Sequence, residues 1–291
     1  MDDFICVEVF AEDDIDSFRK YNVEGMPTLM LISAKGEEIG RFGGFKPPEE
    51  FLKAIEECLI SMDNIKKGAE LLEKNKEDAK GLYLRALGYL YQRGKEAELF
   101  KDLDKLAALK PDENNKTFIC KGLKILSDNL SKRPGRIKPK TIEAAEKEYS
   151  APLIKIIEVD PENKIGETVH ALYKLGVASV RDANKRKEYF DKLKKLDPQD
   201  KSGYADDIAF VEALAPFYKR DYKETAENLQ AFIEKHKSSK LVPKALFQLA
   251  NCWYRLKEKG KCAEVLEKLI NEYPDSGLID SAKKVLKRVK S

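Results

Sequence analysis

The chain has 291 residues, of which 36% are charged and 42% are hydrophobic. This balance is typical of amphipathic helices that each bury one stripe and expose the rest, and the length allows two domains or one domain and an extended array. The formal net charge of +3 excludes a strong overall field toward nucleic acid or an anionic membrane surface.

The first sixty residues predict a small α+β segment. The expected elements are, in order, a strand "FICVEVF" at 4–10, a short helix capped by Asp13 or Asp14, strands at 28–33 and 38–44, and a helix over 46–60. The first strand is apolar almost throughout, as in a strand covered on both faces. Gly36 can take the positive φ of the hairpin turn between the other two strands.

The motifs "KYNVEGMPTLMLI" (20–32) and "GFKPPEEFLKAI" (44–55), in this order of elements, resemble the C-terminal half of a bacterial thioredoxin-like domain. The resemblance implies a cis peptide bond between Met26 and Pro27. It also implies a peptide-binding rim formed by Met26, Pro27 and Gly43, beside the place where the reactive cysteines of the family lie.

The cysteine pattern departs from that family, whose members carry Cys-X-X-Cys at the start of a helix that lowers the thiol pKa. No two of the five cysteines of this chain have that spacing: Cys6, Cys58, Cys120, Cys252 and Cys262. The motif helix and two strands would precede Met1, and one of those strands normally lies between 4–10 and 28–33. We favour a fragment or mis-started product of a longer gene over a sheet whose gap another element closes. No catalytic residue is predicted.

Helical periodicity replaces strand signals from Ser61 onward, with stops at Pro111, Pro161, Pro198 and Pro274. Such recurrence, with periods of roughly 20–50 residues, indicates a helical solenoid in which each two-helix unit packs on its neighbours. Five helix pairs are expected, at 77–111, 115–161, 164–198, 202–237 and 239–274, followed by a capping helix.

The clearest unit is "ALFQLANCWYRLKEKGKCAEVLEKLINEYP" (245–274), and "LYLRALGYLYQRG" (82–94) begins another. Their apolar stripes resemble the tetratricopeptide repeat (TPR), with large, large, small and aromatic residues in the first helix: Leu246, Leu249, Ala250 and Trp253. We therefore predict an α+β partial thioredoxin-like segment at 1–60 and an all-α, TPR-like right-handed solenoid at 61–291. The last pair and cap are similar to repeats of bacterial envelope proteins of the Bam and Tol-Pal systems.

First-helix residues that are not used for packing would line the concave face of such an array. In the two clearest repeats these are Arg85, Tyr89, Gln92 and Arg93, and Phe247, Asn251, Tyr254 and Arg255. Tyr and Arg are favoured anchors for protein ligands because they combine a large contact area with a polar tip.

Other chemistry is not indicated. His170 and His236 lack neighbours at metal-ligand spacing, and Cys252 and Cys262 occupy positions that favour small buried thiols over a disulfide. The basic stretch 131–140 is interpreted as a solvated connector because it lacks interleaved aromatic residues, with RNA binding as the alternative. No metal, cofactor, nucleic acid or membrane span is expected.

The sequence thus predicts a protein-interaction module that binds a partner protein or peptide and is not an enzyme in this form. The alternative is a thiol–disulfide oxidoreductase whose Cys-X-X-Cys half is missing from this chain. A cytoplasmic location is expected if Met1 is the true start, and a periplasmic or other extracytoplasmic one if the chain is truncated.

Overall fold

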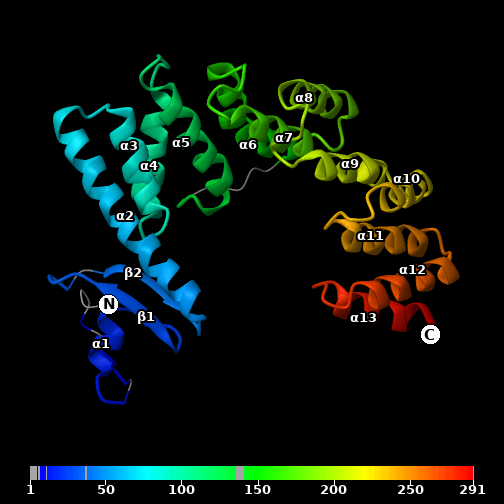
Figure 1. Cartoon of the computed structure of the whole chain (residues 1–291), viewed down its shortest axis with the longest axis horizontal. Coiled ribbons are helices and arrows are strands. Elements are labelled where there is room, and N and C mark those ends of the chain that lie inside the picture. The colour runs from blue at the N-terminus through cyan, green and yellow to red at the C-terminus, as the bar shows by residue number, and fades with distance from the viewer. Residues whose placement is uncertain are drawn as a thin grey trace. The chain divides into compact units, whose positions relative to one another are not determined.

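The computed structural model describes residues 5, 7–10, 12–36, 38–92, 94–135 and 141–290. The chain divides into two compact units, Met1–Ala145 and Glu146–Ser291. A two-stranded sheet near the N-terminus is followed by helices throughout the rest of the described chain (Figure 1). The predicted α+β start and all-α, TPR-like region are therefore confirmed.

The first unit begins with helix α1 (Ile15–Lys20) and the hairpin of strands β1 (Thr28–Ile32) and β2 (Glu38–Gly43). Asp14 caps α1, because its carboxylate accepts a hydrogen bond from the Ser17 backbone N–H at 3.0 Å. The strands pair antiparallel, and Gly36 in the connecting turn has a φ of 78°, as the sequence predicts.

The strand predicted at 4–10 is wrong for the part of it that the structure describes. Val7–Phe10 are not in a strand, and the side chains of Ile5, Val7, Val9 and Phe10 are exposed. Among the described residues β1 pairs with β2 alone, so no strand lies beside Val7–Phe10 to accept their backbone hydrogen bonds. A strand needs such a partner whatever its side chains favour.

Helix α2 (Pro48–Lys74) is longer than the predicted helix and joins the sheet to the repeats. Near its start, the Phe51 ring packs edge to face on Phe42 of β2, with centroids 5.6 Å apart. Farther along, Gly68 lies against the backbone of the next helix, α3 (Ala79–Tyr89), and a β-carbon there would come within 2.7 Å of the Gly81 carbonyl oxygen. The predicted domain boundary at residue 60 falls inside this helix.

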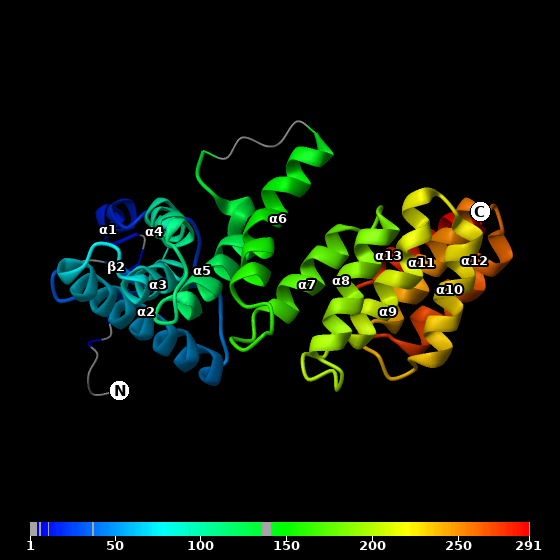
Figure 2. The ribbon, with the colours of Figure 1, turned by 90° about the horizontal axis from the view of Figure 1, so that it is seen from above.

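The first unit continues with α4 (Glu96–Ala108) and α5 (Lys116–Asn129), and the short 3₁₀ turn η1 (Leu130–Lys132) follows. Helices α2 to α5 pack in chain order, each on the next (Figures 1 and 2). Leu99, Leu103 and Leu106 form an apolar stripe of α4 and are all buried. Pro111 lies just beyond α4, where the sequence places the end of a repeat.

The second unit consists of helices and short connections in its described residues. Its elements are α6 (Ile142–Val159, which begins in the first unit), α7 (Thr168–Ala178), α8 (Ala183–Leu196), α9 (Ala205–Leu214), η2 (Ala215–Lys219), α10 (Tyr222–Lys235), α11 (Val242–Arg255), α12 (Lys259–Glu272) and α13 (Ile279–Lys290). From α9 onward each helix packs on the next. These elements supply the helices of the predicted pairs 164–198, 202–237 and 239–274, and α13 lies where the capping helix is predicted.

The buried stripes of the second unit match the repeat pattern. Leu246, Leu249 and Ala250 of α11 and Cys262, Leu266 and Leu269 of α12 belong to one core cluster. In the α7–α8 pair, Gly176 lies against the fully buried ring of Phe190. The small residue expected at this point of a repeat therefore leaves room for a large side chain of the second helix.

Candidate functional site

The loop before β1 carries the predicted cis peptide bond between Met26 and Pro27. The Pro27 carbonyl accepts a hydrogen bond from the Gly44 N–H at 2.9 Å, just beyond the last pair of the hairpin. The Thr28 hydroxyl donates to the Gly25 carbonyl. Met26 itself is exposed, so the loop presents its side chain to solvent while its flanks are held by the hairpin.

Arg41 of β2 attaches this loop to the sheet. Its guanidinium donates to the carbonyl oxygens of Tyr21 and Asn22, the second at 2.9 Å, and to both carboxylate oxygens of Glu38. The Glu38 carboxylate raises the pKa of Arg41 through these hydrogen bonds. Arg41 is not among the predicted site residues, because no local sequence signal indicates that a strand residue reaches a turn about twenty positions earlier.

Met26, Pro27 and Gly43 border one shallow hollow of about 260 Å³, so the structure brings the three predicted rim residues together. The complete lining is Glu24, Gly25, Met26, Pro27, Thr28, Arg41, Gly43 and Gly44. None of the described residues that line the hollow is a cysteine. Cys58 lies behind β2, against Gly40, and its burial raises its thiol pKa. None of the described residues beside the rim therefore offers a thiolate that could exchange a disulfide.

The residues predicted for the first repeat are mostly engaged within the unit. Arg85 donates two hydrogen bonds of 2.6 Å to the buried carboxylate of Asp102. The Gln92 amide lies 3.5 Å from the Ile39 carbonyl of β2. Tyr89 is half-buried, and Arg93 lies outside the described residues. Arg85 and Gln92 thus contribute to the connection among α3, α4 and the sheet.

In the last repeat, Phe247, Asn251 and Tyr254 follow one another along one face of α11, at the spacing of one helical stripe. Phe247 packs partly against the core, the Asn251 amide lies 3.4 Å from the Gln248 side-chain oxygen, and Tyr254 is exposed. The Arg255 guanidinium lies over the Tyr222 ring of α10, 5.9 Å from its centroid. This face combines aromatic area with polar and cationic groups.

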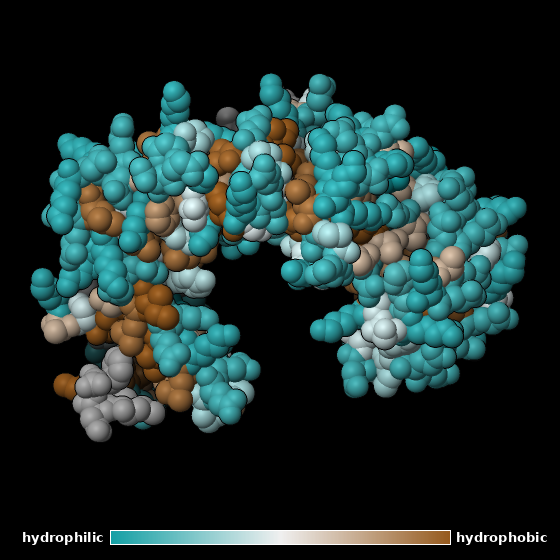
Figure 3. Space-filling model, turned by 45° about the horizontal axis from the view of Figure 1, so that its top comes forward, coloured by the Kyte–Doolittle hydropathy of each residue, from teal (hydrophilic) through white to brown (hydrophobic). Residues whose placement is uncertain are grey.

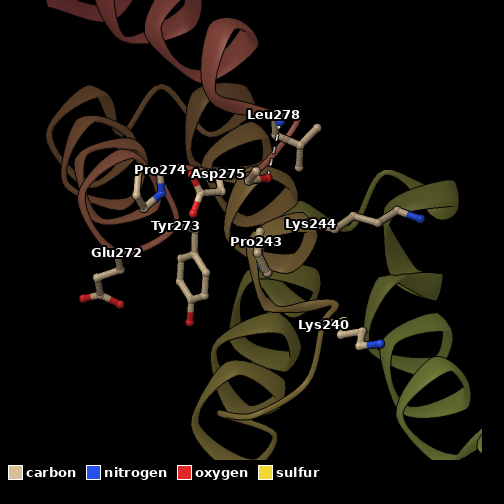
Figure 4. A pocket seen from close by; sticks show the side chains of 9 residues that line it. Lys240, Pro243, Lys244, Glu272, Tyr273, Pro274, Asp275 and Leu278 are labelled. Carbon is tan, nitrogen blue, oxygen red and sulfur yellow. Dashed lines mark hydrogen bonds between the residues drawn. The ribbon is translucent and has the colours of Figure 1, made fainter. Parts of the chain in front are cut away.

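A second hollow, of about 410 Å³, lies where the α12–α13 connection meets the start of α11 (Figure 4). Lys240, Pro243 and Lys244 line one side, and Glu272, Tyr273 and Asp275 are among the residues on the other. Its charges are mixed, and the Lys244 ammonium lies 5.2 Å from the Phe210 ring centroid. The similar stretches "KSSKLVPKAL" and "PDSGLIDSAK" mark its two walls in the sequence.

The cysteines and histidines of the second unit make contacts within the protein. Cys252 and Cys262 are buried and form no disulfide, as expected, and burial raises the pKa of Cys252 to about 11. His170 Nδ1 lies 2.8 Å from the Tyr204 hydroxyl, and His236 Nδ1 lies 2.8 Å from Asp206 Oδ1. In the part of the chain that the structure describes, no group of three His, Cys, Asp or Glu side chains could hold a metal ion.

Part of the basic stretch 131–140 is described. Arg133 forms an ion pair with Asp104, and its guanidinium lies 5.5 Å from the Phe100 ring centroid. Residues 136–140 lie outside the described residues. None of the described helices is long and apolar enough to cross a bilayer.

Comparison with known families agrees with this geometry. Residues 6–59 match the family model of a thioredoxin-like domain, and residues 244–276 match that of the tetratricopeptide repeat. No curated protein matches the chain. The chain therefore combines a thioredoxin-like segment with TPR structure, as its sequence predicts.

Proposed function

We propose that this chain is a protein-interaction module whose repeat helices bind an extended segment of a partner protein. The observation that carries the proposal is the stripe of Phe247, Asn251 and Tyr254 on α11, in the repeat that matches the TPR family model. The buried core cluster uses Leu246, Leu249 and Ala250 of the same helix, and of the stripe only Phe247 packs partly against it. Arg255 extends the same surface, held by Tyr222.

The stripe is suited to a peptide because it combines apolar aromatic surface with a group that can hydrogen-bond to a peptide backbone. Tyr254 and Phe247 offer aromatic area with few rotatable bonds, and the Asn251 amide can both donate to and accept from a peptide backbone. Fixing such side chains on a helix lowers the conformational entropy that binding removes. Arg85 has its charge matched by Asp102, so we assign it to the structure of the first repeat.

The test is selection of binders from a phage-displayed library of random peptides, followed by titration calorimetry with the best synthetic peptide. Tyr254→Ala and Asn251→Ala should each weaken binding by roughly tenfold, about 1.4 kcal/mol. Tyr218→Ala is the matched control, since Tyr218 and Tyr254 are 47% and 43% exposed but Tyr218 lies on η2. Equal losses in all three variants, or no enriched peptide, would contradict the proposal.

The cis-proline rim supports a second peptide site of the same general function. Met26, Pro27 and Gly43 border its hollow, and Arg41 holds the loop against the sheet. The described thiols, Cys58, Cys120, Cys252 and Cys262, are buried, so we propose docking without disulfide exchange. Insulin reduction with dithiothreitol as the electron donor should proceed no faster with the chain than without it, and acceleration would favour the oxidoreductase alternative.

A further inference from the structure

The exposed apolar side chains of this chain are concentrated at its N-terminal end. Among the described residues eighteen large hydrophobic or aromatic side chains are exposed, and thirteen of these belong to the first 62 residues. Brown side chains gather over the hairpin and the start of α2 in Figure 3. Single exposed hydrophobic residues are ordinary on a protein surface, but such a concentration marks an interaction surface.

The exposed area is large enough for a stable interface. The exposed fractions of the thirteen side chains correspond to apolar surface on the order of 1,000 Å², whereas a standard interface buries about 800 Å² on each partner. Leu52 and Leu59 contribute to this surface from one face of α2, two helical turns apart.

The backbone of β1 indicates what kind of group covers this surface. In the described chain β1 has one neighbouring strand, β2, so the backbone groups directed away from β2 can accept a further strand. Leu29 pairs with Phe42, whose ring packs on Phe51, and directly paired residues direct their side chains to the same face. An added strand would therefore extend the sheet face on which α2 lies.

The described residues include a strand-like segment beside which no described strand lies. Val7–Phe10 combine β-branched and aromatic residues with a single charge at Glu8, and their apolar side chains are exposed. In its own chain this segment does not pair with β1. A second copy of the chain would supply a strand partner both for the open edge of β1 and for Val7–Phe10. A two-fold axis would allow each copy to give and receive the same contact.

We propose that two copies of this chain associate through this end, with Val7–Phe10 of each copy adding to the open edge of β1 in the other. The apolar side chains of the added strand and of the α2 face then cover one another. This dimer does not depend on the proposed peptide-binding stripe of α11, so each can fail without the other.

The test is analytical ultracentrifugation over a wide range of concentration, from submicromolar to high micromolar. The wild-type chain should sediment with twice its monomer mass of 33.1 kDa at the upper end and dissociate on dilution. Val7→Glu combined with Val9→Glu should weaken association by tenfold or more, because charges in an added strand oppose edge pairing. Amide hydrogen exchange of Thr28–Ile32 should slow as the wild-type concentration rises.

The matched control is Ile154→Glu, because Ile154 and Val9 are 40% and 44% exposed but Ile154 lies on α6. It should dimerise like the wild type. The Val7 side chain is 77% exposed, so its substitution should leave the fold intact. Circular dichroism of each variant checks that the helical content is unchanged. A monomer of 33.1 kDa at every concentration would overturn the proposal, as would association without a defined mass or an equal effect of both sets of substitutions.

Discussion

Gly40 of β2 lies directly against Cys58 of α2, so closely that a β-carbon at residue 40 would overlap the Cys58 sulfur. Both residues are buried. Gly40→Ala should therefore destabilise the first unit by about 1–3 kcal/mol, the usual cost of overpacking. Urea unfolding, followed through hydrogen exchange of β1 and β2, measures this loss.

Removing the sulfur provides the control for that prediction. Cys58→Ala in the Gly40→Ala background should restore much of the lost stability, because the closest atom is then gone, whereas Cys58→Ala alone should be mildly destabilising. If Gly40→Ala leaves the stability of the hairpin unchanged, β2 does not pack on α2 as described.

The ion pair of Arg85 and Asp102 should be costly to break on one side only. Asp102 is 1% exposed and Arg85 25% exposed, so Asp102→Ala leaves a largely desolvated cation without its two hydrogen bonds. We expect a loss of about 3 kcal/mol in the free energy of unfolding, at the lower end of values for buried pairs because Arg85 retains some solvent contact. Chemical denaturation of the whole chain measures it.

A double variant separates the pair from its surroundings. Arg85→Met with Asp102→Leu removes both charges and retains apolar volume, so it should recover most of the stability that Asp102→Ala loses. The interpretation fails if the double variant is as unstable as the single one.

Tyr173 should make the stability of the second unit fall at high pH. Burial, followed by the nearby Asp207 carboxylate, raises the pKa of Tyr173 to about 12, from an ordinary value of 10.0. Between these values the unfolded chain loses the phenol proton and the folded chain keeps it, so the free energy of unfolding decreases as pH rises. One pKa unit corresponds to ~1.4 kcal/mol, and because the Tyr173 ring is only half-buried we expect a decrease of about 1 kcal/mol or less at pH 11.

Urea unfolding from pH 9 to 11 (about one unit on either side of the ordinary tyrosine pKa) measures this effect in the wild type and in Tyr173→Phe. The Phe variant should show a smaller slope, and Tyr218→Phe, at an exposed position, should keep the wild-type slope. Equal slopes in the three proteins would show that Tyr173 titrates normally in the folded state.

Local signals account for what the sequence predicted well. The turn at Gly36, the cap at Asp14 and the stripe of Leu246, Leu249 and Ala250 depend on neighbours within a few residues or one helix. The cis peptide bond before Pro27 was predicted from a sequence motif, and such a motif also reflects a local backbone conformation.

The features that could not be predicted from the sequence depend on contacts between distant segments. Val7–Phe10 have the side chains of a strand, but a strand also requires a neighbour, and residue types do not specify one. Arg85 was predicted as a binding residue because it lies outside the apolar stripe of its own helix. Only the position of Asp102 on α4 shows that the Arg85 charge is paired within the protein. Arg41 depends in the same way on a distant turn.

Two helical glycines should respond in opposite directions to the same substitution. Gly176 of α7 lies against Phe190, and an added methyl would overlap the ring, whereas nothing lies within 4 Å of the β-carbon position at Gly260 of α12. Gly176→Ala should destabilise the second unit by about 1–3 kcal/mol, because the fully buried ring has no space to move. Gly260→Ala should stabilise it slightly, by about 0.5 kcal/mol or less, because Gly260 is the second residue of α12 and the full propensity gain applies to helix interiors.

Thermal and urea unfolding of the two variants, monitored by circular dichroism, provide the comparison. Both substitutions add one methyl group to a helix, and propensity opposes neither, so a loss at Gly176 alone reports the close packing of α7 on α8. Phe190→Leu in the Gly176→Ala background should reduce the loss by removing ring atoms near the new methyl. If Gly176→Ala is as stabilising as Gly260→Ala, the small residue at this point of the repeat is not required by helix packing.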